Sequence, residues 1–271
     1  MEDQGRKMIC LEVLDQAGQV RGMAEDEDQA IMVFEGVYAE GDRIRLSVPQ
    51  ADCHYVVRVD DAVDEALVYM TRRELVFEIP FGEMKRSWSP RSFTGERHYL
   101  TCRRAEGYEI RAYRNLAENV LDQHGDRGGF PHASTNVETR GEAVFAARNA
   151  IDGIVADRSH GDWPYGSWGI NRRPDAEFTL EFGRPVDIDK IVLYTRADFP
   201  HDNWWVQARL AFSDGSEEQI SLEKGGKAQP FLIQRKEITW IKLSDLIPSS
   251  APSPFPALTQ IQVYGVESKD Q

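Results

Sequence analysis

The sequence predicts an all-β protein, with an N-terminal β-sandwich followed by a second antiparallel β domain. Apolar residues alternate with charged or small residues in many short segments, which is typical of strands with one buried face. Glycine, proline and aspartate break the chain between these segments at short intervals. No alternation of strand and helix patterns is present, so a parallel sheet with helical crossovers is not expected.

The first half contains its strand patterns between about residues 28 and 114. The alternating positions are Ile44, Leu46 and Val48, then Tyr55, Val57 and Val59, then Leu75, Phe77, Ile79 and Phe81. Turn-forming residues such as Gly41 and the pair Asp60-Asp61 separate them. We therefore expect residues 1–115 to form a β-sandwich domain.

The pattern stops between residues 116 and 141. Residues 122–129 are polar and glycine-rich, which predicts a linker or a long surface loop. The domain boundary is placed there, and residues 142–271 are expected to form the second domain. Its first residues, 142–149, suit a short helical turn.

Strand patterns return in the second half. They are Ala176, Phe178, Leu180 and Phe182, then Ile188, Ile191 and Leu193, then Val206, Ala208, Leu210 and Phe212, then Ile220 with Leu222, Ile238 with Trp240, and Ile261 with Val263. Asp214-Gly215, between alternating apolar residues, is a strong hairpin signal. At least six strands are therefore expected here.

Composition limits the classes of partner. The chain has 271 residues, 41% apolar and 28% charged, which is typical of globular proteins. A formal net charge of −13 argues against nucleic acid and anionic lipid as partners, and no apolar run is long enough for membrane insertion.

Residues 1–7 lack the apolar segment of a signal peptide, so we expect a cytoplasmic protein as the sequence stands, or a secreted one if a leader was removed. Cys10, Cys53 and Cys102 are too far apart for a zinc motif and are expected to be buried thiols.

Four motifs occur in the order found in a known family. They are Asn-Ala-Ile-Asp-Gly at 149–153, Phe-Thr-Leu-Glu-Phe-Gly-Arg-Pro-Val at 178–186, Ile-Asp-Lys-Ile-Val-Leu-Tyr at 188–194 and Ile-Gln-Val-Tyr-Gly at 261–265. This arrangement resembles the discoidin-like (coagulation factor type C) domains and, more closely, their bacterial carbohydrate-binding relatives with the galactose-binding jelly-roll fold. The resemblance covers about residues 130–267 and does not extend to residues 1–115.

The resemblance implies an eight-stranded antiparallel jelly roll with a structural calcium ion near the alanine–aspartate–glycine bend. By the family's pattern, Asp152 and Glu267 would contribute side chains, and Asp157 and Ser159 follow the bend closely enough to join them. Calcium takes six to eight oxygen ligands, so loop carbonyls would supply the rest. The alternative is that Asp152 closes a turn by hydrogen bonding, without a metal.

Two aromatic loops are the candidate binding site. One contains Trp163, Tyr165 and Trp168, and it is longer than the corresponding loop of the family; the other spans residues 199–205. Indole and phenol rings beside hydrogen-bonding groups suit a polar ligand with apolar faces, such as a sugar. The expected ligand-binding residues are Trp163, Tyr165, Trp168, Arg172, Arg173, His201, Asp202, Asn203 and Trp205, and His160 and Asn171 lie nearby in sequence.

An alternative is that some of these rings fill the end of the sandwich, especially Trp168 and Trp204. Counting back from Val206 in steps of two puts Trp204 on the core face and Trp205 on the other.

These observations predict a non-catalytic protein that binds a carbohydrate or a similar polyhydroxylated ligand, with stacking on Trp163 or Tyr165. One alternative is a module that binds a protein partner or assembles with other copies through exposed aromatics. Another is a glycan-active hydrolase or lyase that uses His201 and Asp202. Since no nucleophile elbow, phosphate-binding loop or zinc-protease motif is present, catalysis is not expected.

Overall fold

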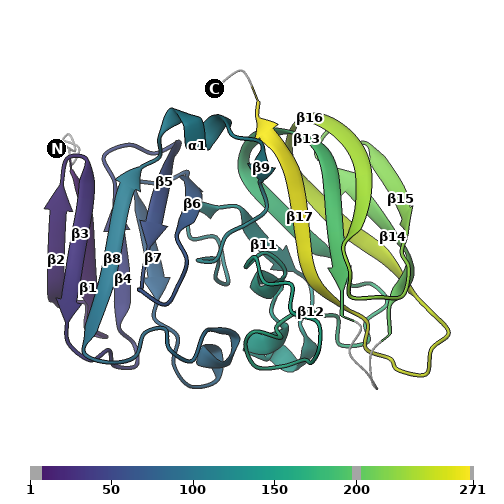
Figure 1. The fold of residues 1–271 in the computed structure, drawn as a ribbon, viewed down its shortest axis with the longest axis horizontal. Helices are drawn as coiled ribbons and strands as arrows, with labels where there is room; N and C mark the ends of the chain where they lie inside the picture. The colour runs from purple at the N-terminus through teal and green to yellow at the C-terminus, as the bar shows by residue number, and fades with distance from the viewer. Residues whose placement is uncertain (1–7, 197–202, 269–271) are drawn as a thin grey trace.

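The computed structural model describes residues 8–196 and 203–268, which form two β lobes side by side (Figure 1). Nearly all regular structure is strand and every strand pairing is antiparallel, which confirms the predicted all-β class. The elements of the N-terminal lobe are β1 (Ile9–Leu14), β2 (Val20–Asp26), β3 (Gln29–Glu35), β4 (Arg43–Ser47), β5 (Cys53–Arg58), β6 (Ala66–Met70), β7 (Glu74–Glu78), the 3₁₀ helix η1 (Gly82–Ser87), β8 (Arg97–Arg104) and α1 (Gly107–Arg111).

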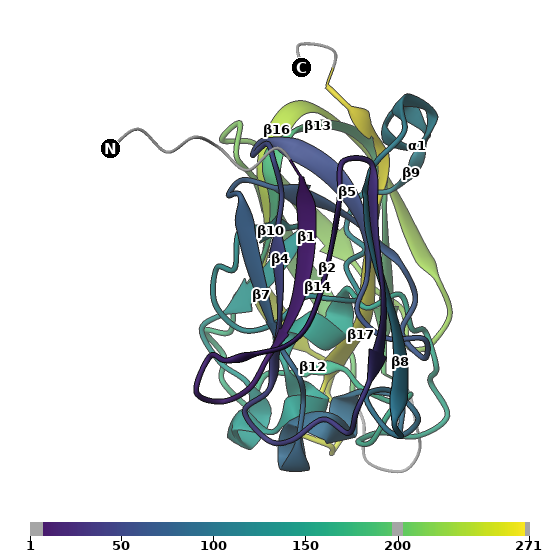
Figure 2. The ribbon, with the colours of Figure 1, turned by 90° about the vertical axis from the view of Figure 1, so that its left-hand side faces the viewer.

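The N-terminal lobe is a sandwich of two sheets. One has the strand order β2-β1-β4-β7, and the other has the order β10-β6-β5-β8-β3. In the view of Figure 2 the first sheet lies to the left and strands β5 and β8 of the second lie to the right. Side chains from both sheets, such as Leu11, Ile44, Val57 and Leu100, form one core.

The sandwich begins earlier in the chain than the sequence pattern indicates. Strand β1 is the second strand of its sheet, and all six of its residues are buried. Period-two alternation is therefore missing from β1, which explains why the pattern first becomes visible near residue 28.

The C-terminal lobe is a second antiparallel sandwich. Its elements are β9 (Arg114–Asn115), β11 (His132–Thr135), the 3₁₀ helices η2 (Thr139–Gly141), η3 (Ala143–Phe145) and η4 (Ala147–Ala150), then β12 (Trp168–Gly169), β13 (Phe178–Thr195), β14 (Trp205–Phe212), β15 (Glu217–Ser221), β16 (Gln229–Pro248) and β17 (Ala257–Glu267). The strand order is β12-β17-β13-β16-β14-β15, with β11 added on β13 and β9 on β17. The predicted hairpin at Asp214-Gly215 joins β14 to β15, and Gly215 has φ 82°.

Strands β13 and β16 are long and irregular. Their pairing shifts register three times, between Glu181 and Lys190 of β13. Such irregularities bend strands, so that one strand can serve both layers of a sandwich. The core between the layers contains Phe178, Leu210 and Ile261, each fully buried.

Residues 116–141 differ from the expected linker. Strand β10 (Gly129–Phe130) pairs with β6 of the first lobe, and β11 pairs with β13 of the second. Leu116 belongs to the C-terminal core, and the carboxylate of buried Asp122 lies 2.7 Å from Nδ1 of His132. Residues 124–126 form an exposed loop, as the polar composition predicts, whereas Asp122 and His132 are buried and hydrogen-bonded.

A buried ion cluster joins the lobes at the end of β17. Glu267 accepts hydrogen bonds from Arg184 of β13, at 2.8 and 2.9 Å, and from Arg114 of β9, at 2.5 Å. His54 of the N-terminal lobe lies 3.2 Å from the same carboxylate. Burial would raise the pKa of Glu267, but the hydrogen bonds of His54 and Arg184 hold it well below its usual range.

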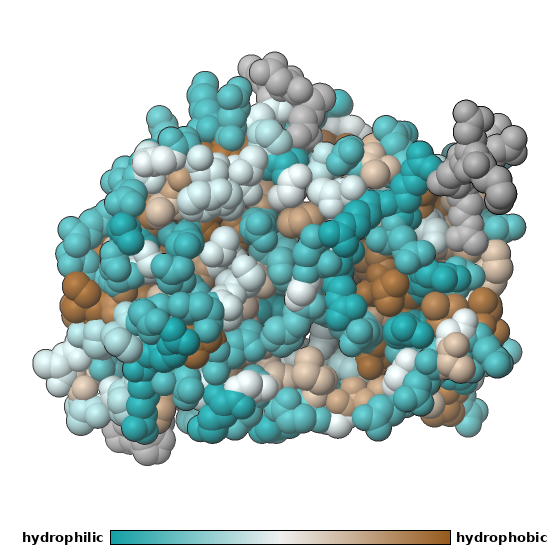
Figure 3. All heavy atoms as spheres, turned by 180° about the vertical axis from the view of Figure 1, so that it is seen from behind, coloured by the Kyte–Doolittle hydropathy of each residue, from teal (hydrophilic) through white to brown (hydrophobic). Residues whose placement is uncertain are grey.

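The surface is mainly polar. The face opposite that of Figure 1 is largely hydrophilic, with apolar residues in scattered patches (Figure 3). Within residues 8–196 and 203–268, no helix has the length and apolar character that a membrane span requires.

Candidate functional site

One cavity of the C-terminal lobe lies where several loops meet beside β12 and the start of β17. Its volume is about 190 Å³. We call it the arginine pocket, and it is lined by Thr139, Arg140, Phe145, His160, Gly169, Ile170, Asn171, Arg172, Arg196, Phe255, Pro256 and Ala257. These residues come from η2, η3, β12 and the loops at the end of β13 and before β17, which are far apart in sequence.

Unusual backbone geometry shapes one side of the arginine pocket. Arg140, Asn171 and Arg172 have φ of 54°, 48° and 62°, in the left-handed region that side chains other than glycine rarely adopt. Gly169 permits a close approach, because a Cβ there would lie 2.5 Å from the hydroxyl oxygen of Thr139. That hydroxyl accepts a hydrogen bond from the backbone N–H of Asn171 at 3.0 Å. Strained residues gathered around a cavity are typical of functional sites.

Guanidinium groups stack on aromatic rings in the arginine pocket. Arg172 lies over Phe255 at 4.5 Å from the ring centre, and buried Arg196 lies over Phe145 at 5.6 Å. Arg140 lies at 5.8 Å from the same Phe145 ring. Such cation–π contacts favour holding the arginine side chains beside the rings.

The polar groups of the arginine pocket are mainly hydrogen-bond donors. Among the lining residues that the structure describes there is no aspartate or glutamate. Arg140 forms a two-pronged ion pair with Glu142, whose pKa it lowers. Arg172 makes no hydrogen bond or ion pair with any described residue, so its donors face a ligand or water.

Of the expected ligand-binding residues, the structure places Arg172 in the arginine pocket, together with His160 and Asn171. Arg173 points elsewhere, in an ion pair with Asp175. Trp163 and Tyr165 do not line this cavity. The backbone N–H of Trp163 instead donates to the carbonyl of Arg86 in the other lobe, at 2.8 Å, and the Trp163 side chain is 36% exposed.

Two tryptophans expected to bind ligand are core residues. Trp168 is 0% exposed and Trp205 is 1% exposed, so neither presents a ring face to solvent. Trp168 packs against Phe178 and Trp205, and its indole N–H donates to the carbonyl of Val137 at 2.9 Å. Gly169, which lines the arginine pocket, follows Trp168 directly in β12.

A β-bulge explains why the predicted orientation of Trp204 and Trp205 was wrong. Trp205 pairs with Pro248 and Gln207 with Ile247, so β14 has one extra residue at this point. Beyond a bulge the alternation changes phase, and every side chain before it faces the opposite way. Trp205 is therefore buried, while Val206 is exposed and Trp204 is half-buried.

Asn203 is buried and holds a loop in place instead of facing a ligand. It is 3% exposed, and its side-chain amide donates to the carbonyls of Ser249, Ala251 and Ser253 at 3.2, 3.4 and 2.9 Å. These bonds hold the loop between β16 and β17. His201 and Asp202, the other expected ligand-binding residues, lie outside the described residues.

The four expected calcium ligands have different surroundings in the structure. Glu267 belongs to the ion cluster between the lobes, and exposed Ser159 and half-buried Asp157 lie in the loop after Asp152. Within the described ranges, the group of acidic and histidine side chains close enough to share an ion is Asp60, Asp61 and His98, in the other lobe. The calcium ion at Asp152, Asp157, Ser159 and Glu267 therefore stays a prediction.

Asp152 still has an unusual environment. Burial raises its pKa to about 7, and the nearby carboxylate of Glu118 adds to the effect. Its side chain accepts a hydrogen bond from the backbone N–H of Ile154 at 2.9 Å, which closes a turn.

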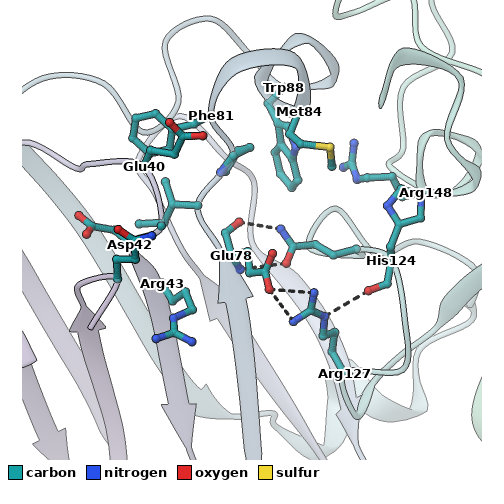
Figure 4. Close-up of a pocket in the computed structure, with 15 residues that line it drawn as sticks. Glu40, Asp42, Arg43, Glu78, Phe81, Met84, Trp88, His124, Arg127 and Arg148 are labelled. Atoms are coloured by element: carbon teal, nitrogen blue, oxygen red, sulfur yellow. Dashed lines mark hydrogen bonds and ion pairs between the residues drawn. The ribbon is translucent and has the colours of Figure 1, made fainter. Parts of the chain in front are cut away.

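A larger cavity, of about 430 Å³, lies between the lobes (Figure 4). Several of its polar groups bind one another, whereas Arg43 makes no hydrogen bond or ion pair with a described residue. Arg127 donates to Glu78 through both terminal nitrogens at 3.1 Å and to the carbonyl of His124 at 3.2 Å. Arg148 stacks on Trp88 at 4.0 Å and donates to backbone carbonyls, including that of Asp122 at 2.9 Å. Most of its lining belongs to the N-terminal lobe, to which the resemblance of the four sequence motifs does not extend.

Sequence reasoning missed part of the arginine pocket. Phe145, Arg140, Arg196 and Phe255 were not expected to bind ligand. Phe255 stands in a loop punctuated by prolines just before the last strand, so an aromatic in a predicted loop was a usable signal. Nothing in the local pattern distinguishes Arg140 or Arg196 from the chain's other arginines.

Comparison with known proteins gives the following matches. A family model described as "Domain of unknown function (DUF7402)" matches residues 130–253. No curated protein matches the sequence. Among solved structures, the lectin domain of lectinolysin in complex with Lewis B antigen is 17% identical, with 56% of this chain and 96% of that chain covered and a TM-score of 0.41.

Two other solved structures have similar sequence identities, coverages and TM-scores. Chitosan-binding module 1 of a chitosanase/glucanase from Paenibacillus sp. IK-5 is 14% identical, with coverage of 56% and 100% and a TM-score of 0.38. The family 32 carbohydrate-binding module of NanJ from C. perfringens, in complex with galactose, is 16% identical, with coverage of 49% and 91% and a TM-score of 0.37. These structures are carbohydrate-binding modules and lectin domains, the kind of domain that the four sequence motifs resemble.

Proposed function

We propose that the C-terminal lobe binds carbohydrate in the arginine pocket. The observation that carries this proposal is Arg172, which is stacked on Phe255 at 4.5 Å while its hydrogen-bond donors have no partner among the described residues. A guanidinium fixed in this way is ready to bind the oxygens of a ligand with little loss of side-chain entropy.

The rest of the arginine pocket suits a sugar. Half-buried Phe255 offers apolar ring surface to the C–H face of a pyranose, buried Phe145 adds an apolar wall, and Asn171 and Thr139 offer polar groups to its hydroxyls. The ligands named with similar structures, Lewis B antigen and galactose, support this class of ligand. The expected stacking on Trp163 or Tyr165 is replaced in this proposal by stacking beside Phe145 and Phe255.

The proposed role is binding without catalysis. Most glycosidases need two carboxyl groups on either side of the scissile bond. The described lining of the arginine pocket contributes arginine, histidine and amide groups instead. An open site of this size predicts weak binding, in the range that multivalent glycans strengthen.

A glycan array tests the proposal with the intact protein and two variants. Arg172→Gln removes the charge and the fork of donors in the pocket, and Arg173→Gln is the matched control, because Arg173 is the next residue but does not line the cavity. We expect the wild type and Arg173→Gln to bind the same glycans and Arg172→Gln to lose them. Equal binding by all three proteins would contradict the proposed site, and no binding to any glycan would contradict the function.

We also propose that the C-terminal lobe binds a structural calcium ion at Asp152, with Glu118 as a further ligand in place of Glu267, which is paired with arginines. The support is the buried carboxylate of Asp152, whose pKa Glu118 helps to raise. Excess calcium is then expected to raise the melting temperature and chelator to lower it, an effect absent from Asp152→Asn. Identical melting in calcium and chelator would contradict the proposal.

A further inference from the structure

We infer that the arginine pocket selects an acidic sugar, one with a carboxylate on its ring. This inference rests on the carbohydrate binding proposed above and specifies the class of glycan. It follows from the kind of polar groups in the pocket, the state of Arg172 and the shape of the cavity.

The polar groups favour a ligand rich in acceptors. A neutral sugar presents hydroxyls that both donate and accept, and sites for such sugars benefit from carboxylates that accept the hydroxyl protons. The described lining contains three arginines and His160 and no carboxylate. Arg140 is paired with Glu142, and Arg196 and His160 have interactions of their own, so the donors that a ligand meets are those of Arg172. A carboxylate only accepts, so it complements such a lining.

Arg172 is the residue best placed to bind that carboxylate. Its neighbours in sequence and space already have anionic partners, since Arg173 pairs with Asp175 and Arg140 with Glu142. Arg172 has no such partner within the described ranges, in a chain with 45 acidic and 32 basic residues. The planar fork of a guanidinium matches a carboxylate through two parallel hydrogen bonds.

The cavity has room for one charged ring. Its volume of about 190 Å³ corresponds to roughly six water molecules at about 30 Å³ each. The rings of Phe145 and Phe255 line it, so a bound pyranose would have an apolar face against an aromatic ring and its carboxylate toward Arg172. One acidic sugar residue of a longer chain, rather than a cluster of charges, fits this arrangement.

The test uses pairs of polysaccharides that differ only in charge. Polygalacturonate, alginate and hyaluronan are each compared with their carboxyl-reduced forms, in which a neutral CH₂OH group replaces every carboxylate. Carrageenan, which is sulfated and has no carboxylate, is added. The intact wild-type protein and the variants Arg172→Gln, Arg172→Lys and Arg173→Gln are titrated by calorimetry.

We expect at least one carboxylated polymer to bind, with a loss of about 10- to 100-fold in affinity on carboxyl reduction, the range for hydrogen bonds to charged groups. Arg172→Gln should show the same loss, Arg172→Lys a smaller one and Arg173→Gln none. Added salt should weaken binding of the wild type.

Other outcomes would overturn the inference in distinct ways. Neutral glycans bound as tightly as acidic ones through Arg172 would refute the acidic class and leave the proposed function standing. Carrageenan bound as tightly as the carboxylated polymers would refute the preference for carboxylate. If neither the acidic polymers nor a neutral glycan array binds at all, the proposed function itself fails.

Discussion

At the scale of single residues, aromatic side chains predicted to lie in loops are buried in some cases and exposed in others. Trp168 and Trp205 pack in the core, while Trp163 is partly exposed at the seam between the lobes. Composition alone does not separate these cases, because both kinds of loop contain the same turn-forming residues. The difference arises from which loop residue becomes a short strand, as Trp168 does in β12 by pairing with β17.

The buried and the exposed tryptophan should differ in how much their replacement by alanine lowers the free energy of unfolding. Trp168→Ala removes a fully buried ring and a hydrogen bond to Val137, so we expect a loss of about 3–5 kcal/mol in the free energy of unfolding. Trp163→Ala should cost less than about 1 kcal/mol. Urea unfolding followed by circular dichroism measures both values. Equal losses for the two variants would contradict the burial described above.

The arginine pocket was only partly predictable at this scale. Arg172 was identified from its place beside an aromatic loop, and that part of the prediction agrees with the cavity. Phe255 and Arg196 join it from more than 20 residues away in sequence, because the end of β13 and the start of β17 are neighbours in the sheet. A single sequence contains the local pattern but not this long-range pairing.

At the scale of elements, sequence periodicity predicted strands well where one face is buried. It failed for β1, which is buried on both faces, and it gave the wrong phase for the start of β14, where a bulge inserts one residue. Strand β16 was recognised only at Ile238 and Trp240, because exposed residues such as Leu232 weaken its pattern elsewhere. Alternation with a period of two residues detects regular strands with one buried face. It misses strands that are buried on both faces and stretches of strand whose apolar residues are exposed.

The ion cluster at the end of β17 predicts how the stability of the protein depends on pH. The pKa of Glu267 is lowered in the folded protein below its ordinary value of 4.5, so the carboxylate stabilises the fold fully above about pH 4.5 and loses this contribution as pH falls further. Glu267→Gln would leave the buried guanidinium group of Arg184 and the half-buried one of Arg114 without their counter-charge. We expect a loss of about 3–5 kcal/mol at pH 7.

Thermal unfolding of the wild type and Glu267→Gln between pH 3 and pH 8 measures this effect. The difference between their melting temperatures should be largest at neutral pH and should shrink as pH falls below about 4.5. A difference that stays constant over the whole range would show that the Glu267 charge is not the stabilising element.

At the scale of the whole molecule, the chain between the lobes belongs to both of them. Strand β9 pairs with β17, Leu116 lies in the C-terminal core, and β10 pairs with β6 of the N-terminal lobe. The expected linker was placed in this region because its sequence is polar and rich in glycine. Such a composition is compatible with buried hydrogen bonds, as the pairing of Asp122 with His132 shows.

This arrangement predicts where the C-terminal lobe can be separated. A fragment of residues 113–271 keeps β9 and Leu116, whereas a fragment of residues 130–271, close to the start of the matching family model, lacks both. We expect the shorter fragment to be less stable by about 2–5 kcal/mol, the cost of losing a large buried side chain and its contacts. Urea midpoints of the two fragments measure it, and equal midpoints would show that β9 contributes nothing.

The most direct measurement of the central claim is a crystal structure of the intact protein with the best ligand from the glycan array. The proposed site predicts a sugar ring in the arginine pocket, with an oxygen within about 3 Å of the Arg172 guanidinium and the ring against Phe145 or Phe255. A sugar bound instead in the cavity between the lobes, or beside Trp163 with the arginine pocket empty, would contradict it.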